Sequence, residues 1–268
     1  MYSTLGQITL VQSTYARRLE MVSKDAFVQR EAAYFRENIA KIETGDQLID
    51  DYRLYSFAMK AFGLESEIYA KGLMRKVFNE GILDPKSTAN RLADAKFREI
   101  AEAFGFAESG NLNMQDPDKV EAIVQRYLRQ ELEVREGEEN EAVRLALYFD
   151  RQITKVENWY EVLADPALAE VVRTGLGLPR EYALIDIDRQ AAFFEDRLKL
   201  EDFKDAEKRR TFIERFGAQW DLQQMTASPG SGILVANGIA PIQPLRPGET
   251  VLGSISPSLL AELAKYRI

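Results

Sequence analysis

Any chemistry done by this chain must rely on carboxylates, lysines and tyrosines, because the sequence contains no histidine and no cysteine. A Ser-His-Asp triad, a thiolate nucleophile, and a metal site built from histidine or cysteine are therefore excluded. Paired carboxylates can still act as general acid and general base. The chain holds 43 acidic residues, so a given pair becomes meaningful only where a cleft brings its members together.

Three short motifs resemble ligand sites without completing them. Asp186 and Asp188 form an Asp-x-Asp pair, but residues two apart do not face each other on a helix, and no further oxygen ligands flank them. The segments Gly175–Gly177 and Gly230–Gly232 lack the remaining glycine and the preceding strand of a phosphate-binding loop. We interpret the first motif as a solvated pair and the others as turns, and we expect no cofactor and no metal.

A run of acidic residues lies near the middle of the chain, where the segment from Glu131 to Glu141 contains six glutamates. A cluster of carboxylates could bind a cation. A charge run is more typical of a solvated helix face, and Gly137 could introduce a loop into it. We therefore interpret the run as a solvated face or a loop.

The balance of charge excludes a chain-wide basic surface of the kind that binds nucleic acid. Lysine and arginine total 35 against 43 acidic residues, which gives a net charge of −8. The N-terminus lacks the basic start and apolar stretch of a secretory signal, and no apolar run is long enough to span a membrane. Residues 1–16 carry no charged side chain, which indicates either a frayed terminus leading into a helix or an unstructured export address.

The hydrophobic pattern predicts an all-α, multihelical fold. Leu54, Phe57, Ala58 and Ala61 recur at helical spacing, and no segment before residue 230 shows sustained alternation with a period of two. Asp-Pro pairs predict helix starts and glycines predict helix ends. The predicted starts are Asp84-Pro85, Asp116-Pro117 and Asp165-Pro166, and the predicted ends are Gly63, Gly81, Gly105, Gly177 and Gly217.

The chain also repeats itself. Residues 32–64 align without gaps on residues 146–178, 114 residues later, with ten identities over 33 positions. Phe104-Gly105 also matches Phe216-Gly217, which extends the repeat with small gaps.

The repeat predicts two related helical units, residues 1–115 and 116–225, followed by a tail at residues 226–268. Trp159 aligns with Gly45, and we interpret it as a side chain that fills a gap between the units.

The tail differs in composition from the rest of the chain. From Ser228 to Pro257 it is rich in glycine and proline, with short apolar runs between them. A solvated loop has little reason to carry so many Ile, Leu and Val residues. We expect residues 230–256 to pack, extended, on the helical body, or alternatively to bind a partner protein by strand addition or groove filling. The candidate partner-binding residues are Ile233, Leu234, Val235, Ile239, Ile242 and Leu245.

Residues 34–106 resemble a bacterial family known by a domain-of-unknown-function label, number 1217. The resemblance is carried by the segments Asp51–Leu54, Ala58–Leu64 and Asn90–Asp94. It is specific for the first unit and weaker for the second, and family members with more than one copy fit the internal repeat. The resemblance implies a multihelical fold and an alphaproteobacterial source, with the gene often among flagellar genes. It carries over no activity, cofactor or catalytic residue.

On this basis we expect a non-catalytic structural or interaction protein linked to flagellar assembly or motility, with a protein partner such as a flagellar component. One alternative is an enzyme that uses carboxylates, lysine or tyrosine between the two units, which requires a deep pocket with shifted acids. Another is a cytoplasmic chaperone or regulator of an exported flagellar subunit, which requires an exposed apolar groove. We expect a cytoplasmic protein, or one exported to the flagellum without a cleavable signal peptide, with no nucleic-acid partner and no membrane insertion.

Overall fold

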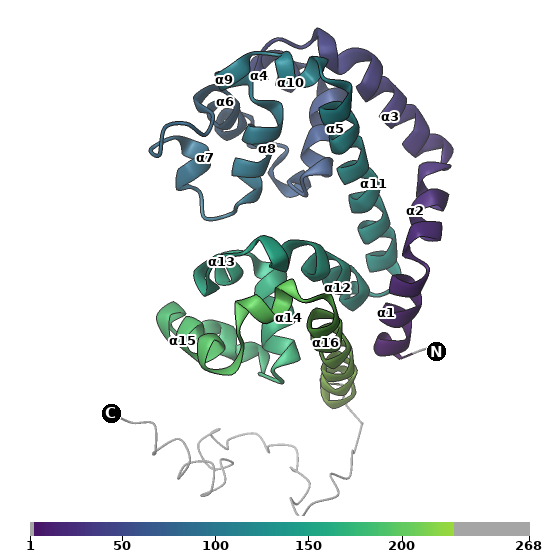
Figure 1. Ribbon diagram of the computed structural model, residues 1–268, viewed down its shortest axis with the longest axis vertical. Coiled ribbons are helices and arrows are strands. Elements are labelled where there is room, and N and C mark those ends of the chain that lie inside the picture. Colours follow the sequence, from purple (N-terminus) through teal and green to yellow (C-terminus); the bar gives the residue numbers. More distant parts are fainter. Residues whose placement is uncertain (1–2, 228–268) are drawn as a thin grey trace, which may run out of the picture. The chain divides into compact units, whose positions relative to one another are not determined.

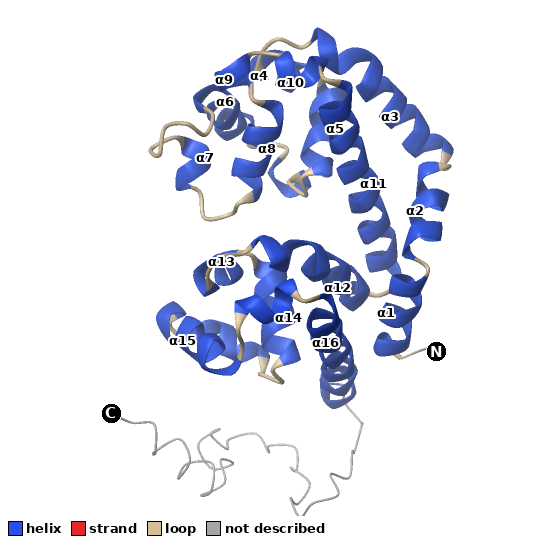
Figure 2. Ribbon diagram, viewed as in Figure 1, coloured by secondary structure: helices blue, strands red, loops and turns tan. Residues whose placement is uncertain are grey.

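The structure is a computed structural model that describes residues 3–227. Throughout this range the chain is helical and contains no strand (Figure 1, Figure 2), which confirms the predicted all-α fold. The elements in chain order are α1 (Thr4–Ser13), α2 (Tyr15–Ser23), α3 (Ala26–Asn38), η1 (Ile39–Lys41), α4 (Gly45–Asp50), α5 (Tyr52–Ala61), η2 (Glu65–Glu67), α6 (Lys71–Glu80), α7 (Thr88–Arg91), α8 (Lys96–Phe104), α9 (Phe106–Ser109), α10 (Leu112–Gln115), α11 (Pro117–Glu139), α12 (Glu141–Gln152), η3 (Ile153–Lys155), α13 (Trp159–Ala164), α14 (Pro166–Gly175), η4 (Arg180–Leu184), α15 (Ile187–Arg197), η5 (Leu200–Lys204) and α16 (Ala206–Ala227), where η marks a short 3-10 helix.

Two hydrophobic cores lie within residues 3–224, which belong to one compact unit. The first lobe, α2 to α11, packs around buried side chains that include Phe35 and Tyr127. The second lobe, α12 to α16, packs around Phe149 and Phe216. Helix α11 joins the lobes, because it packs on α5 of the first lobe and is followed directly by α12, on which it also packs.

The repeated segments form the same succession of elements. In the first lobe α3 ends at Asn38 and is followed by η1, α4 and α5. In the second lobe α12 ends at Gln152 and is followed by η3, α13 and α14. Each helix end and each of these short elements falls 114 residues after its counterpart, as in the alignment of the two sequences.

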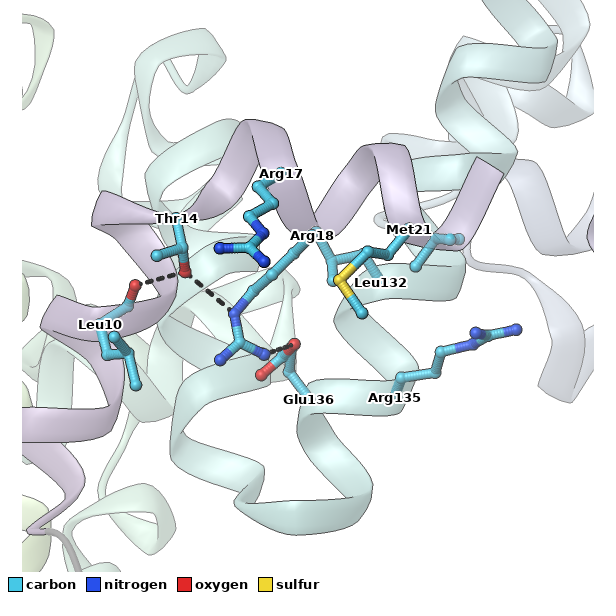
Figure 3. A pocket seen from close by; sticks show the side chains of 9 residues that line it. Leu10, Thr14, Arg17, Arg18, Met21, Leu132, Arg135 and Glu136 are labelled. Carbon is cyan, nitrogen blue, oxygen red and sulfur yellow. Dashed lines mark hydrogen bonds and ion pairs between the residues drawn. The ribbon is translucent and has the colours of Figure 1, made fainter. Parts of the chain in front are cut away.

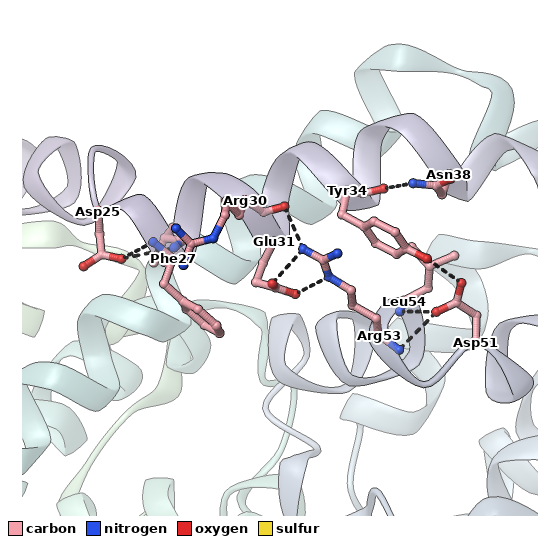
Figure 4. Close-up of polar contacts among 10 residues, drawn as sticks. Asp25, Phe27, Arg30, Glu31, Tyr34, Asn38, Asp51, Arg53 and Leu54 are labelled. Carbon is pink, nitrogen blue, oxygen red and sulfur yellow. Dashed lines mark hydrogen bonds and ion pairs between the residues drawn. The ribbon is translucent and has the colours of Figure 1, made fainter.

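Side-chain contacts agree as closely as the helix bounds. The Tyr34 hydroxyl donates to the Asp51 carboxylate at 3.0 Å (Figure 4), and the Tyr148 hydroxyl donates to Asp165. Each aspartate also caps the helix that follows it, α5 or α14, by accepting hydrogen bonds from two backbone N–H groups. We propose that the two lobes descend from one helical unit, since matching residues at matching positions build both.

Gly63 and Gly177 follow the matching helices α5 and α14 with φ of +68° and +72°, a region that favours glycine. A Cβ on Gly63 would meet no atom closer than 3.6 Å, so the cost of a side chain there is a backbone cost. We expect Gly63→Val to lower the free energy of unfolding by about 1 kcal/mol or more, measured by thermal melting. Gly72→Val is the control, because a Cβ on that glycine of α6 has nothing within 4 Å. Equal melting temperatures for the two variants would contradict this explanation.

The predicted helix end at Gly217, and with it the match to Gly105, is wrong. Gly105 follows α8 in the left-handed conformation, whereas Gly217 lies inside α16. The space beside Gly217 is taken by α1, where a Cβ would lie 3.0 Å from Ile8 and 3.2 Å from Leu5. The close approach of two helices, rather than the end of one, accounts for this glycine.

We propose that α16 corresponds to α11 instead. Gln130 of α11 is the side chain nearest to Gly63, and Gln219 of α16 is the side chain nearest to Gly177. Four helices, α7 to α10, precede α11, whereas only η5 separates α15 from α16. Because the second lobe has no equivalent of the stretch from α7 to α10, α11 and α16 do not align when only small gaps are allowed between the repeats.

One of the three predicted Asp-Pro helix starts is also wrong. Asp84 and Pro85 form a turn, and α7 begins only at Thr88. The Glu80 carboxylate accepts the Thr88 N–H at 2.6 Å, so a side chain from α6 satisfies the first turn of α7. The other two pairs begin α11 and α14, as predicted.

Trp159 fills the core of the second lobe rather than a gap between the units. Its ring centre lies 5.7 Å from that of Phe194, and only 7% of the residue is exposed. At the aligned Gly45 of the first lobe, a Cβ would come within 2.4 Å of the Cβ of Phe78. In the first lobe, Phe78 of α6 therefore fills the space beside Gly45. In the second lobe, the side chain of Trp159 fills the equivalent space.

Helix α1 packs in the second lobe although it begins the first repeat. Ile8 and Val11 are buried in the second core, at 1% and 2% exposure. The Thr4 N–H donates to the Asp221 carboxylate of α16 at 2.9 Å. The uncharged N-terminal segment is thus a docked helix from Thr4 to Ser13, and the prediction of a frayed terminus is wrong for these residues.

Candidate functional site

The six apolar tail residues predicted to bind a partner, Ile233 to Leu245, lie outside the described residues. The predicted packing of residues 230–256 lies outside them as well. Within residues 3–227, several places bring together charged or aromatic side chains, and three of them bear on the predicted functions. They are the cleft between the lobes, the glutamates of α11, and a groove beside α1 and α2.

The cleft between the lobes is where an enzyme acting between the repeats would need its site. Lys96 of α8 lies 5.3 Å from the centre of the Tyr148 ring and 3.8 Å from the Asp165 carboxylate. The cavity beside these side chains measures about 70 Å³. Pockets for small molecules usually start at about 300 Å³, so this cavity has no room for a substrate. A larger cavity of about 850 Å³ also lies between the lobes, but its acids Glu133 and Asp150 are both held in ion pairs with arginines.

Electrostatics keeps the central acid of this cleft ionised. Glu99 pairs with Arg126 at 2.6 Å and with Lys155 at 3.0 Å. Burial on its own would raise the pKa of Glu99, but the hydrogen bond from Arg126 and the charge of Lys155 outweigh it and lower the pKa. Burial and the Asp165 carboxylate raise the pKa of Tyr148, whose hydroxyl therefore stays protonated. A general acid needs a raised carboxyl pKa, so the cleft favours a contact between lobes over catalysis.

In each lobe a cation lies near the matching tyrosine, Tyr34 or Tyr148, but it comes from a different position in the chain. In the first lobe the guanidinium of Arg53 lies 4.0 Å from the centre of the Tyr34 ring, on the face drawn in Figure 4. The residue aligned with Arg53 in the second lobe is Ala167. Beside this small side chain, the Tyr148 ring lies near two cations, Arg151 of α12 at 5.1 Å and Lys96 from the other lobe at 5.3 Å.

Ala167→Arg would copy the arrangement of the first lobe into the second. The new guanidinium is expected to take the place of Lys96 over Tyr148 and to weaken the contact between the lobes by about 1 kcal/mol. Hydrogen exchange of residues 93–99 should then accelerate by about fivefold, and Lys96→Ala should have a similar effect. Unchanged exchange in both variants would mean that this contact does not hold the lobes together.

The glutamates of α11 are partly buried, so the prediction of a solvated face or a loop at Gly137 is wrong. The helix passes Gly137 without interruption. Glu131, Glu133 and Glu136 are only 6%, 3% and 8% exposed. Buried carboxylates need partners, because an unpaired buried charge is costly.

Each buried glutamate pairs with a cation from a different helix of the chain. The pairs are Glu131 with Lys60 of α5 at 2.6 Å, Glu133 with Arg151 of α12 at 2.9 Å, and Glu136 with Arg18 of α2 at 2.5 Å. Ion pairs thus connect helix α11 to α5 of the first lobe, to α12 of the second lobe and to α2 near the N-terminus. The three buried glutamates of the run therefore have a structural role.

The Asp-x-Asp motif also has a structural role. Asp186 caps α15 by accepting from the N–H groups of Asp188 and Arg189, and the Asp188 carboxylate accepts from the Tyr160 hydroxyl at 3.0 Å. Residues 3–227 contain no cluster of three or more acidic side chains arranged to hold a metal ion. In the same range, no helix is both long enough and apolar enough to cross a membrane.

A groove lies between the α1–α2 pair and α11 (Figure 3), with a volume of about 410 Å³. Its floor is apolar, since Val22 and Leu132 are buried. Leu10 and Met21 also line it and are 47% and 65% exposed. Apolar side chains that stay exposed beside a buried apolar floor are typical of an interaction surface.

Three arginines and one glutamate line the same groove. Arg18 pairs with Glu136 at 2.5 Å, and Arg135 pairs with Asp25 at 3.2 Å. Arg17 is exposed and makes no ion pair within the described part of the chain. The groove thus presents positive charge and apolar surface together, in a chain whose net charge is −8.

The chain belongs to the DUF1217 family of proteins of unknown function, whose family model matches residues 61–208. This single match runs from the end of α5 to the first turn of α16, and so covers parts of both lobes. The chain is also similar to a protein from Agrobacterium tumefaciens, an alphaproteobacterium, whose X-ray structure was determined as a structural-genomics target. The two are 38% identical with a TM-score of 0.75, over 81% of this chain and 92% of that one. No curated protein matches the chain.

Proposed function

We propose that this protein is a non-catalytic interaction component of flagellar assembly or motility. The flagellar part of the proposal rests on the resemblance in residues 34–106 to a family whose genes often lie among flagellar genes. The interaction part rests on one observation, the groove between α1–α2 and α11. In it, exposed Leu10 and Met21 lie beside Arg17, which makes no ion pair with any residue that the structure describes. A surface of this composition is suited to a protein partner.

A cytoplasmic chaperone or regulator of an exported flagellar subunit is the second candidate. The same groove supports it, because a chaperone for a single subunit must offer an exposed apolar surface. A carboxylate-based enzyme with its site between the lobes receives no such support. The cavity beside Glu99 is about 70 Å³, and that acid has a lowered pKa. In the larger cavity of about 850 Å³ between the lobes, Glu133 and Asp150 are paired with arginines.

Besides the groove, the tail is another part of the chain that could bind the partner. Its apolar residues from Ile233 to Leu245 have the composition of a segment that adds to a partner or fills its groove. If the tail serves a partner, truncation at about Thr226 leaves thermal melting unchanged and abolishes capture of that partner. If it packs on the helical body, truncation lowers the melting temperature.

An in-frame deletion of the gene, scored for swimming in soft agar, tests the proposal. We expect a swimming defect that the wild-type gene restores from a plasmid. The two candidates then separate by the amounts of flagellar subunits. A chaperone defect leaves one exported subunit low both inside the cell and outside it, whereas loss of a structural component leaves subunit amounts in the cell unchanged. Normal swimming of the deletion strain would contradict the flagellar role.

A further inference from the structure

The groove has the length and shape of a site for one helix. Leu10, Thr14, Arg17 and Met21 line it from one side at spacings of four, three and four residues, which places them on one helical face across the α1–α2 junction. The span from Leu10 to Met21 corresponds to about 16 Å of helix, or about three turns. Leu132 and Arg135 line the groove from α11, so it is open along its length between two helical walls.

Positive charge stands on both walls of the groove. Arg17 lies on the α2 side and Arg135 on the α11 side, with Met21 between them in Figure 3. Arg135 is 40% exposed at its side chain despite its pair with Asp25, so its guanidinium remains within reach of a second carboxylate. Arg17 makes no ion pair within the described residues, although its charge acts on Glu20 one turn along α2, so pairing with an incoming acid breaks no existing ion pair there.

We infer that this groove binds an acidic amphipathic helix of a partner protein. Such a helix has an apolar stripe facing Leu10, Met21 and Leu132, and Asp or Glu residues on both edges that meet Arg17 and Arg135. The inference rests on the proposed interaction role and specifies the chemistry of the partner. Its basis is charge complementarity, because three arginines and one glutamate line the groove, and Arg17 makes no ion pair within the described residues.

The probe is a fluorescein-labelled helical peptide of about 15 residues, with leucines at helical spacing and glutamates on both edges of the leucine stripe. Its partner probe has lysine at every glutamate position. Fluorescence anisotropy with the full chain should show binding of the acidic peptide only. Arg17→Glu should weaken that binding by about tenfold or more, because it turns an attractive contact into a repulsive one.

Arg30→Glu is the matched control. Arg30 is exposed on α3, does not line the groove, and its replacement changes the net charge by the same amount. We expect it to alter the affinity by less than about twofold. Carbon-13 labelling of the methionine methyl groups gives a local readout, in which Met21 should shift on addition of the acidic peptide.

Three results would overturn the inference. One is equal binding of the acidic and basic peptides, or binding that Arg17→Glu leaves unchanged. Another is Arg17-dependent binding to vesicles containing phosphatidylglycerol without binding of the peptide, which would assign the groove to an anionic lipid surface. The third is an Arg17-dependent dimer in sedimentation without peptide, which would assign the groove to a second copy of the chain.

The outcome is separable from that of the flagellar proposal. Peptide binding that depends on Arg17, together with normal swimming of the deletion strain, supports the groove and rejects the flagellar role. A swimming defect without peptide binding rejects the groove and leaves the flagellar role standing.

Discussion

Replacement of Ile8 by alanine is expected to destabilise the second lobe by about 3 kcal/mol, although the residue lies in the first helix of the chain. Ile8 is 1% exposed and belongs to the core of the second lobe together with Val11. Its side chain also lies beside Gly217 of α16, where an added Cβ would come within 3.0 Å of it because the two helices approach closely. Truncating it leaves a cavity that the second lobe cannot fill by a small adjustment.

Thr9→Ala is the control for this variant, because Thr9 is exposed on the same helix. We expect its effect to stay within about 0.5 kcal/mol. Chemical denaturation gives the free energies, and hydrogen exchange shows where stability is lost. Ile8→Ala should reduce protection in α12 and α16 and leave α5 of the first lobe protected. Equal loss in both lobes would mean that α1 does not belong to the second core.

Glu133→Gln is expected to lower the free energy of unfolding by about 3 kcal/mol. Both carboxylate oxygens of Glu133 accept from the Arg151 guanidinium, at 2.9 Å and 3.0 Å. The glutamate side chain is 3% exposed and that of Arg151 is 21% exposed. Loss of the negative charge leaves a largely buried guanidinium without its counter-charge, which costs far more than the loss of a surface ion pair.

Glu138→Gln tests whether the burial of Glu133 is the reason for the large loss of stability expected for Glu133→Gln. Glu138 lies on the same helix, is exposed, and makes no ion pair within residues 3–227. We expect its replacement to change stability by no more than about 0.5 kcal/mol. Similar losses for Glu133→Gln and Glu138→Gln in urea denaturation would show that the pair with Arg151 contributes no special stability.

Features that depend on neighbouring residues were predictable from the sequence. Asp165 followed by Pro166 starts α14, and Gly63 and Gly177 follow helix ends, because capping and positive φ are decided within a few residues. The repeat was predictable over residues 32–64 for a similar reason. Each copy carries the same local signals at the same spacing.

Features that depend on distant partners were not predictable in this way. Glu133 resembles any solvated glutamate until α12 brings Arg151 beside it. Gly217 resembles a helix end until α1 is seen to occupy the space next to it. Both errors come from packing between elements that lie far apart in the sequence, which local patterns do not encode.

The groove could have been found only in part. Leu10, Arg17 and Met21 share a helical face, and that pattern is visible in the sequence once α1 and α2 are treated as one helical stretch. The opposite wall comes from α11, more than a hundred residues later, and its contribution requires the tertiary structure.

Swimming of a strain that carries Arg17→Glu in the chromosomal gene tests the central claim most directly. The claim is that this protein works by binding a partner through the groove of α1, α2 and α11. We expect Arg17→Glu to reproduce the swimming defect of the deletion at wild-type protein levels, and Arg30→Glu to swim normally. Wild-type swimming of the Arg17→Glu strain, alongside a clear defect in the deletion, would contradict the claim.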